Sequence, residues 1–356
     1  MRTRSSRGAV PAVIATLGFL VVSSAPIVGV ATAETVPYFT KIDCHAGSAC
    51  LATTFRTVWR SAGWGTGWEV VLNAPADGDV NGVACSGSSC LAYGGLGPGI
   101  AQTGGWLAWS SDGGVTFEAP ADVGDPVWSA ACRGSTCTAL ARPEEFNATD
   151  EAILRGTAFG PLTRYTRAAG VFMDLQGVDI SCSNSLTCVA VGDGNDPIMR
   201  FDFGGTRASV STYCKLLSPC WALLPKAVEC LGSTCIALSW SGYTDRRTGT
   251  KIIVSRTTGR SWATKVTYAS ANVLDVSCVS TKVCVGVGAS GLAVRSVDYG
   301  TTWRRVSTPA RSWFQSVSCI PSGRCLAVAM DGAVMYSANS GSSWVLRPKF
   351  TGLATP

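Results

Sequence analysis

The segment VSCVSTKVCVGVGASGLAVRSVDYGTTW, residues 276–303, contains three signals in a fixed order. A close cysteine pair comes first, a glycine-centred turn at 289–291 follows, and the motif Ser-x-Asp-x-Gly-x-Thr-Trp ends the segment. Cysteines a few residues apart suit a short hairpin, and an uninterrupted apolar run suits a strand covered on both faces. The segment therefore predicts one antiparallel unit of four strands A to D, at 274–278, 283–288, 293–297 and from Trp303 onward.

The sixteen cysteines of the chain form eight close pairs. An even number of close pairs in an exported chain favours disulfides, and four or five intervening residues place the partners opposite one another across a hairpin. Zinc would need tetrahedral clusters with histidine ligands, and the chain has one histidine, so we expect no metal. The expected disulfides join Cys44 to Cys50, Cys85 to Cys90, Cys132 to Cys137, Cys182 to Cys188, Cys214 to Cys220, Cys230 to Cys235, Cys278 to Cys284 and Cys319 to Cys325.

The cysteine pairs mark a repeat. Without the pair Cys214 and Cys220, their first members recur at intervals of 41, 47, 50, 48, 48 and 41 residues, a period typical of propeller blades. Removing residues 1–33 leaves 356 − 33 = 323 residues, about 46 for each of seven repeats. We predict an all-β fold, a single seven-bladed β-propeller of four-stranded antiparallel blades over 34–356, with a disulfide in the A–B hairpin of each blade. The blades are expected to start near 38, 79, 126, 175, 226, 273 and 314; the sequence leaves open how the ring closes.

The second motif recurs in register with the cysteines. Its best copies are Ser110-x-Asp112-x-Gly114-x-Thr116, Ser255-x-Thr257-x-Gly259-x-Ser261, Ser296-x-Asp298-x-Gly300-x-Thr302 and Ser337-x-Asn339-x-Gly341-x-Ser343. These copies resemble the Asp-box of bacterial neuraminidase repeats, found in sialidases and in related secreted propellers. The resemblance implies the scaffold only, because the Phe-Arg-Ile-Pro signature of sialidases is absent and the expected blade number is seven instead of six.

The N-terminus carries an export pattern. Arg2, Arg4 and Arg7 precede the apolar run AVPAVIATLGFLVV, and a small-residue site ends at Ala33. This order predicts a signal peptide over 1–33 that is cleaved after Ala33, and hence a secreted, extracellular protein. An uncleaved membrane anchor is the alternative, but prolines interrupt the run, and no later stretch could span a membrane.

Charge limits the classes of partner. Removal of three arginines leaves 29 − 3 = 26 basic against 23 acidic residues, a net charge of +3 without a basic stripe. We therefore expect no nucleic-acid partner and no membrane span in the mature form. The expected partner is a glycan or an extracellular protein, bound by a monomer that needs no cofactor.

Blade topology separates two faces. The A–B turns, which join cysteine partners, and the C–D hairpins share one face, here called the cysteine-hairpin face; the B–C and D–A connections form the opposite, loop face. Loops usually carry binding groups, and aromatic rings beside polar groups suit sugars. The alternative is that these residues pack between blades. The ligand-binding candidates on the loop face are Trp240, Tyr243, Asp245, Arg246, Arg311, Trp313 and Trp128.

Three function classes remain. A non-catalytic binding protein leads, because the single histidine, His45, lies on the cysteine-hairpin face, away from any nucleophile. The alternative is a sialidase-like glycoside hydrolase or polysaccharide lyase that acts on extracellular polysaccharide; its catalytic candidates are Asp245, Glu144, Glu145, Arg246, Arg247 and Arg56. The third class is an extracytoplasmic assembly or scaffold factor. The pair Cys214 and Cys220, which has no blade of its own, is expected to staple an enlarged D–A loop.

Overall fold

The computed structural model describes residues 38–45, 49–97, 102–142, 152–157, 162–166, 174–193, 198–203, 209–212, 224–240, 249–268 and 272–348. All of these residues belong to the unit Thr35–Pro356. They form seven four-stranded sheets in which each strand pairs antiparallel with the next strand along the chain.

The first four blades contain β1 (Lys41–Cys44), β2 (Cys50–Thr53), β3 (Thr57–Ser61) and β4 (Trp68–Asn73); β5 (Gly78–Ser86), β6 (Ser89–Leu96), β7 (Gly104–Ser110) and β8 (Ala121–Asp122); β9 (Val127–Arg133), β10 (Thr136–Ala141), β11 (Ala152–Thr157) and β12 (Thr163–Thr166); and β13 (Asp174–Asn184), β14 (Thr187–Asp193), β15 (Ile198–Asp202) and β16 (Ser209–Thr212). The last three contain β17 (Leu224–Leu231), β18 (Thr234–Trp240), β19 (Thr250–Ser255) and β20 (Ala263–Tyr268); β21 (Val273–Cys278), β22 (Cys284–Gly288), β23 (Ala293–Ser296) and β24 (Arg304–Val306); and β25 (Phe314–Cys319), β26 (Cys325–Ala329), β27 (Val334–Ser337) and β28 (Val345–Leu346). A 3-10 turn, η3 (Ala289–Gly291), joins β22 to β23.

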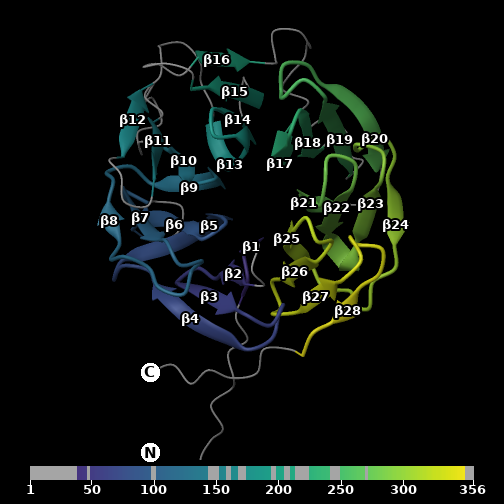
Figure 1. Cartoon of the computed structure of the whole chain (residues 1–356), viewed down its shortest axis with the longest axis horizontal. Coiled ribbons are helices and arrows are strands. Elements are labelled where there is room, and N and C mark those ends of the chain that lie inside the picture. Colours follow the sequence, from purple (N-terminus) through teal and green to yellow (C-terminus); the bar gives the residue numbers. More distant parts are fainter. Residues whose placement is uncertain are drawn as a thin grey trace, which may run out of the picture. The chain divides into compact units, whose positions relative to one another are not determined.

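The innermost strand of every sheet contacts the innermost strands of the two neighbouring sheets. These contacts run from β1 through β5, β9, β13, β17, β21 and β25 and return to β1, so the ring is closed. Figure 1 shows these seven strands around a common centre, with the outer strands toward the rim. The predicted seven-bladed propeller is confirmed.

The predicted hairpin disulfides are present in all seven blades. In each, the two cysteines are directly opposed across the inner strand and its neighbour, and their Cα atoms lie 3.9 to 4.1 Å apart. The bridges join Cys44 to Cys50, Cys85 to Cys90, Cys132 to Cys137, Cys182 to Cys188, Cys230 to Cys235, Cys278 to Cys284 and Cys319 to Cys325.

The eighth predicted disulfide is the one without a blade of its own. Both of its cysteines, Cys214 and Cys220, lie outside the described residues. Their pairing, and the staple that they were expected to form in an enlarged D–A loop, therefore stay predictions.

The Ser-x-Asp-x-Gly hairpins fold locally and also pack between blades. Ser296 Oγ accepts the Gly300 N–H at 2.9 Å, and the carboxylate of Asp298 accepts both the N–H and the hydroxyl of Thr302. In the next blade, Gly341 has a φ of +73°, and a Cβ there would lie 2.5 Å from a methyl of Val285 in the preceding blade. Only glycine combines that backbone conformation with so close an approach.

The apolar core fills the spaces between adjacent blades. Val285 and Val287 of β22 are completely buried and belong to one cluster with Ala327 and Met335 of the following blade. A strand covered on both faces in this way needs a continuous apolar run, as the sequence of β22 indicated.

Direct contacts join the first and last blades, each of which has four strands of its own. Ser316 and Ser318 of β25 accept the N–H groups of Ile42 and Cys44 through their hydroxyls, at 3.3 and 2.9 Å. Farther out, the Arg347 guanidinium donates to a backbone carbonyl in the hairpin of the first blade. Closure among the described residues therefore uses side chains instead of an exchanged strand.

Candidate functional site

A pocket of about 480 Å³ lies on the loop face of the sixth blade. The turn η3 forms one wall, and the connection that leaves β24 forms another. Trp313, in the connection to the last blade, lines this pocket with 53% of its surface exposed. The pocket is lined by Asn272, Ala289, Ser290, Gly291, Leu292, Ala293, Arg305, Val306, Ser307, Thr308 and Trp313.

Backbone contacts fix this region. The Gly291 N–H donates to the Ser312 carbonyl at 2.8 Å, and the Thr308 hydroxyl donates to the Gly291 carbonyl at 2.5 Å. Gly291 approaches the following connection so closely that a Cβ there would lie 1.8 Å from the Ala310 carbonyl oxygen. The turn and the connection that carries Trp313 are thus held together before any ligand binds.

The pocket offers a stacking surface and polar groups. Trp313 presents an exposed ring, Arg305 is the one charged side chain among the lining residues, and Asn272 and Ser290 supply amide and hydroxyl groups. Exposed aromatic rings with a few polar neighbours are typical of sites that bind sugars or extended peptides.

Of the other predicted site residues, none that the structure describes lines this pocket. Arg311 is exposed in the same connection but is not among the lining residues. Trp128, expected in a connection, is half-buried as the second residue of β9. Trp240 ends β18, and its side chain is not described. The remaining candidates, Tyr243, Asp245, Arg246, Arg247, Glu144 and Glu145, lie outside the described residues.

Arg56, one of the catalytic candidates, makes hydrogen bonds that stabilise the fold. Its guanidinium donates to the carbonyl oxygens of Gly78 at 2.6 Å, Ala76 at 2.7 Å and Pro75 at 3.3 Å. These bonds hold the connection between β4 and β5 and use three of the five N–H donors of the guanidinium.

A second cavity, of about 370 Å³, lies between the inner strands and was not anticipated from the sequence. Its acidic, basic and histidine lining residues lie at three levels along the inner strands, counted in sequence positions from the first cysteine of each pair. Lys41, Asp179 and Asp275 precede their cysteines by three positions, Asp43 and Glu229 by one, and Arg133 and His45 follow by one.

Most of the carboxylates link neighbouring blades. Asp43 accepts the Cys85 N–H at 2.7 Å, Asp179 accepts the Val228 N–H at 2.9 Å, and Asp275 accepts the Val317 N–H at 2.8 Å. In each case the N–H belongs to the inner strand of the next blade, at an edge that no strand of the described sheets pairs with. These contacts satisfy backbone donors that would otherwise be unpaired.

The pKa values of Asp43, Glu229 and Asp275 in this cavity are raised. Burial raises the pKa of Asp43 to about 6, although the Cys85 N–H and Ser318 oppose the shift. Burial also raises the pKa of Glu229 to about 7, against the attraction of Arg133. Burial and the nearby Asp179 raise the pKa of Asp275. Desolvation and like charges both favour the neutral acid.

The two cations are held in different ways. Burial lowers the pKa of Lys41, but the attraction of the Asp179 carboxylate, 3.1 Å from its Nζ, together with that of Tyr93 and Asp275 outweighs burial, and the net shift is upward. Arg133 donates to the backbone carbonyls of Cys182 and Cys230, the latter at 2.8 Å. The Arg133 guanidinium, from the third blade, therefore links the inner strands of the fourth and fifth blades.

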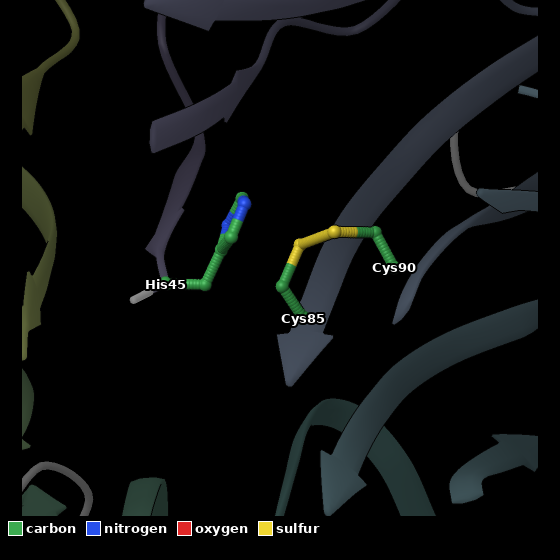
Figure 2. A group of neighbouring side chains, drawn as sticks. All are labelled: His45, Cys85 and Cys90. Carbon is green, nitrogen blue, oxygen red and sulfur yellow. A yellow bond between two sulfur atoms is a disulfide. The ribbon is translucent and has the colours of Figure 1, made fainter. Parts of the chain in front are cut away.

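His45 stands beside the Cys85–Cys90 disulfide (Figure 2). Its ring and the two sulfurs lie within 4.8 Å of one another, a spacing that could hold a metal ion. The sulfurs are bonded to each other, however, so they are not thiolate ligands. The group therefore does not fit a metal as it stands.

Solved structures resemble this chain in fold. YCF48 bound to D1 peptide matches with a TM-score of 0.60 and 14% identity over 86% of this chain and 95% of that chain. The GH74 enzyme of Niastella koreensis matches with a TM-score of 0.63 and 14% identity over 87% of this chain, and this chain spans only 54% of the GH74 chain. A WD40 β-propeller domain matches with a TM-score of 0.57 and 13% identity over 88% of this chain and 96% of that domain. At such identities the likeness shows the fold alone.

No family model and no curated protein matches the sequence. Among the described residues, no helix has the length and apolar character needed to cross a membrane. The established class is therefore a disulfide-linked seven-bladed β-propeller, a fold that serves both enzymes and binding proteins.

Proposed function

We propose that this chain is a secreted, non-catalytic propeller that binds a glycan or an extracellular protein through its loop face. The observation that carries the proposal is the half-exposed ring of Trp313 on a preorganised pocket with Arg305 and Asn272. A fixed wall around an exposed aromatic residue lowers the entropic cost of binding. The peptide bound to the similar YCF48 propeller supports including proteins among the ligands.

Localisation and family are part of this proposal. The disulfides in every blade fit an oxidising compartment and support export through a signal peptide removed after Ala33. The mature chain, 34–356, would then be one propeller domain. The hydrogen bonds of the Ser296 and Ser337 hairpins support placing the chain among Asp-box propellers.

A glycan array and a pull-down from extracellular protein test the binding role. The wild-type protein should retain a ligand, and Trp313→Ala should weaken that binding by about thirtyfold or more, since an aromatic anchor commonly contributes about 2 kcal/mol or more. Phe55→Ala is the matched control, because Phe55 is 54% exposed but is not among the residues that line the pocket. Absence of any retained ligand, or equal losses in both variants, would refute the proposed site.

A further inference from the structure

The cavity between the inner strands carries more acid than base. Its lining includes four carboxylates, Asp43, Asp179, Glu229 and Asp275, and two cations, Lys41 and Arg133, so full ionisation leaves 4 − 2 = 2 negative charges in excess. Among these described side chains, only Lys41 and Asp179 form an ion pair at short range. The Glu229 carboxylate accepts a 3.3 Å bond from the Ser181 hydroxyl and keeps lone pairs for further donors.

An unpartnered acceptor lines the same cavity. His45 is 7% exposed, and its Nδ1 has no hydrogen-bond partner among the described residues. Burial and Arg60 lower the pKa of its ring, so the ring is neutral at pH 8; because Nδ1 has no partner, Nε2 is the nitrogen that forms the hydrogen bond of the ring with the Gly113 backbone. With Nε2 engaged there, Nδ1 is left as the acceptor nitrogen. A buried acceptor without a protein donor is available to a donor from a ligand or a water.

The spacing of the acids argues against a single metal ion. No three of the described carboxylates bring oxygen atoms within 4.8 Å of one another, the proximity that a shared ion requires. Acceptors that are separated at several levels of the cavity suit a ligand whose donors are separated as well. A linear chain of ammonium groups has this arrangement.

The cavity opens on the cysteine-hairpin face. Gly87 and Pro321, both exposed in turns between cysteine partners, line one end. We propose that this cavity binds a linear organic polycation, an aliphatic polyamine or the lysine side chains of an extended peptide, which enters between the cysteine turns. Its ammonium groups would donate to Glu229, Asp43 and the His45 Nδ1. This site is separate from the Trp313 pocket.

Calorimetry with spermine at pH 8 and low salt tests the proposal on the oxidised protein. One spermine should bind, the melting temperature should rise, and Glu229→Gln should weaken binding by about tenfold, since a desolvated charge pair is lost. Glu69→Gln is the matched control, because it removes one carboxylate by the same change at an exposed position of β4 and should leave affinity unaltered. Asp43→Asn, which keeps an acceptor for the Cys85 N–H, replaces Glu229→Gln if that variant does not fold.

A comparison of two probes, spermine and trilysine, distinguishes a free polyamine from a lysine-containing peptide as the ligand. Tighter binding of spermine than of trilysine indicates a free polyamine, and the reverse indicates a peptide; either result supports the site. Failure of both probes to bind at millimolar concentration, equal loss in Glu229→Gln and Glu69→Gln, or Ca²⁺ binding as tight as spermine binding would overturn it. Trp313→Ala should leave spermine affinity unchanged, so this test and that of the loop-face pocket fail independently.

Discussion

Two aspartates of the sixth blade, Asp298 and Asp275, have opposite surroundings. Asp298 sits in an exposed hairpin, where hydrogen bonds from Thr302 and Ser296 outweigh slight burial and lower the pKa of its carboxyl. Asp275 lies between the inner strands, where burial and Asp179 raise its pKa. The first environment is made by the residue's own neighbours in sequence, and the second exists only after blades from the whole chain have assembled. Local motifs therefore build each blade, whereas assembly creates the chemistry at the centre.

The largest loss of stability is expected where a hairpin meets the neighbouring blade. Gly341→Ala would place a Cβ at a φ of +73° and 2.5 Å from Val285, so we expect the free energy of unfolding to fall by about 2–4 kcal/mol. Guanidinium unfolding measures this loss. Gly87→Ala, at a φ of +64° with no atom within 4 Å of the added Cβ, should cost only about 1 kcal/mol. Similar losses would show that contact between blades contributes little.

The two aspartates should respond differently to loss of charge. Asp298→Ala removes the acceptor for two Thr302 donors and should cost about 1–2 kcal/mol of unfolding free energy at pH 8. Asp275→Asn keeps an oxygen for the Val317 N–H and removes repulsion, so stability should stay the same or rise. Chemical unfolding of both variants tests this contrast; the opposite ranking would contradict it.

The free energy of unfolding should fall in two pH ranges, one as pH rises toward neutrality and one as pH falls below the unfolded pKa of aspartate. The folded-state pKa values of Asp43, about 6, and Glu229, about 7, exceed their unfolded values, so the stability they contribute is complete below about pH 4 and lost as pH rises through 6 to 7. Asp112 acts in the other direction. Despite slight burial, bonds from Thr116 lower its pKa to about 2, so its contribution is present above the unfolded value and is lost as pH falls toward 2.

Thermal melts between pH 5 and 8 test the loss of stability that Asp43 and Glu229 are expected to cause as pH rises. The melting temperature should be higher at pH 5 than at pH 8, and Glu229→Gln should flatten the slope because one titrating group is gone. A wild-type slope that the substitution leaves unchanged would show that other groups control it.

The smallest effect on stability is expected at the proposed binding site. Trp313 is exposed, so Trp313→Ala should change the free energy of unfolding by no more than about 0.5 kcal/mol while ligand binding falls. Thermal melts beside binding assays separate the two quantities. A large drop in melting temperature would identify Trp313 as a packing residue.

The sequence predicted the architecture well because its determinants are local and repeated. Cys278 and Cys284 mark a hairpin by their spacing alone, and the following apolar run predicts a strand buried on both faces. Trp313 was expected in the connection before the last blade, and the structure places it there; its role in binding stays a prediction.

The central cavity could not be predicted in the same way. Asp275 was expected within the strand 274–278, and the structure places it in β21, three residues before Cys278, but one strand alone does not indicate that its side chain lines a central cavity. A charged residue three positions before the first cysteine of a blade was a usable signal, since Lys41 and Asp179 occupy the same position in their own blades. Their proximity nevertheless depends on how seven blades close, and no single repeat encodes that geometry.

Hydrogen exchange with and without the ligand retained in the binding assays tests the central claim most directly. The account predicts that ligand protects amides of 289–293 and 306–314, which frame the Trp313 pocket, and leaves those of 296–303 unchanged. Protection centred on the hairpin 296–303, with none around Trp313, would contradict the division between residues that build the blade and residues that bind.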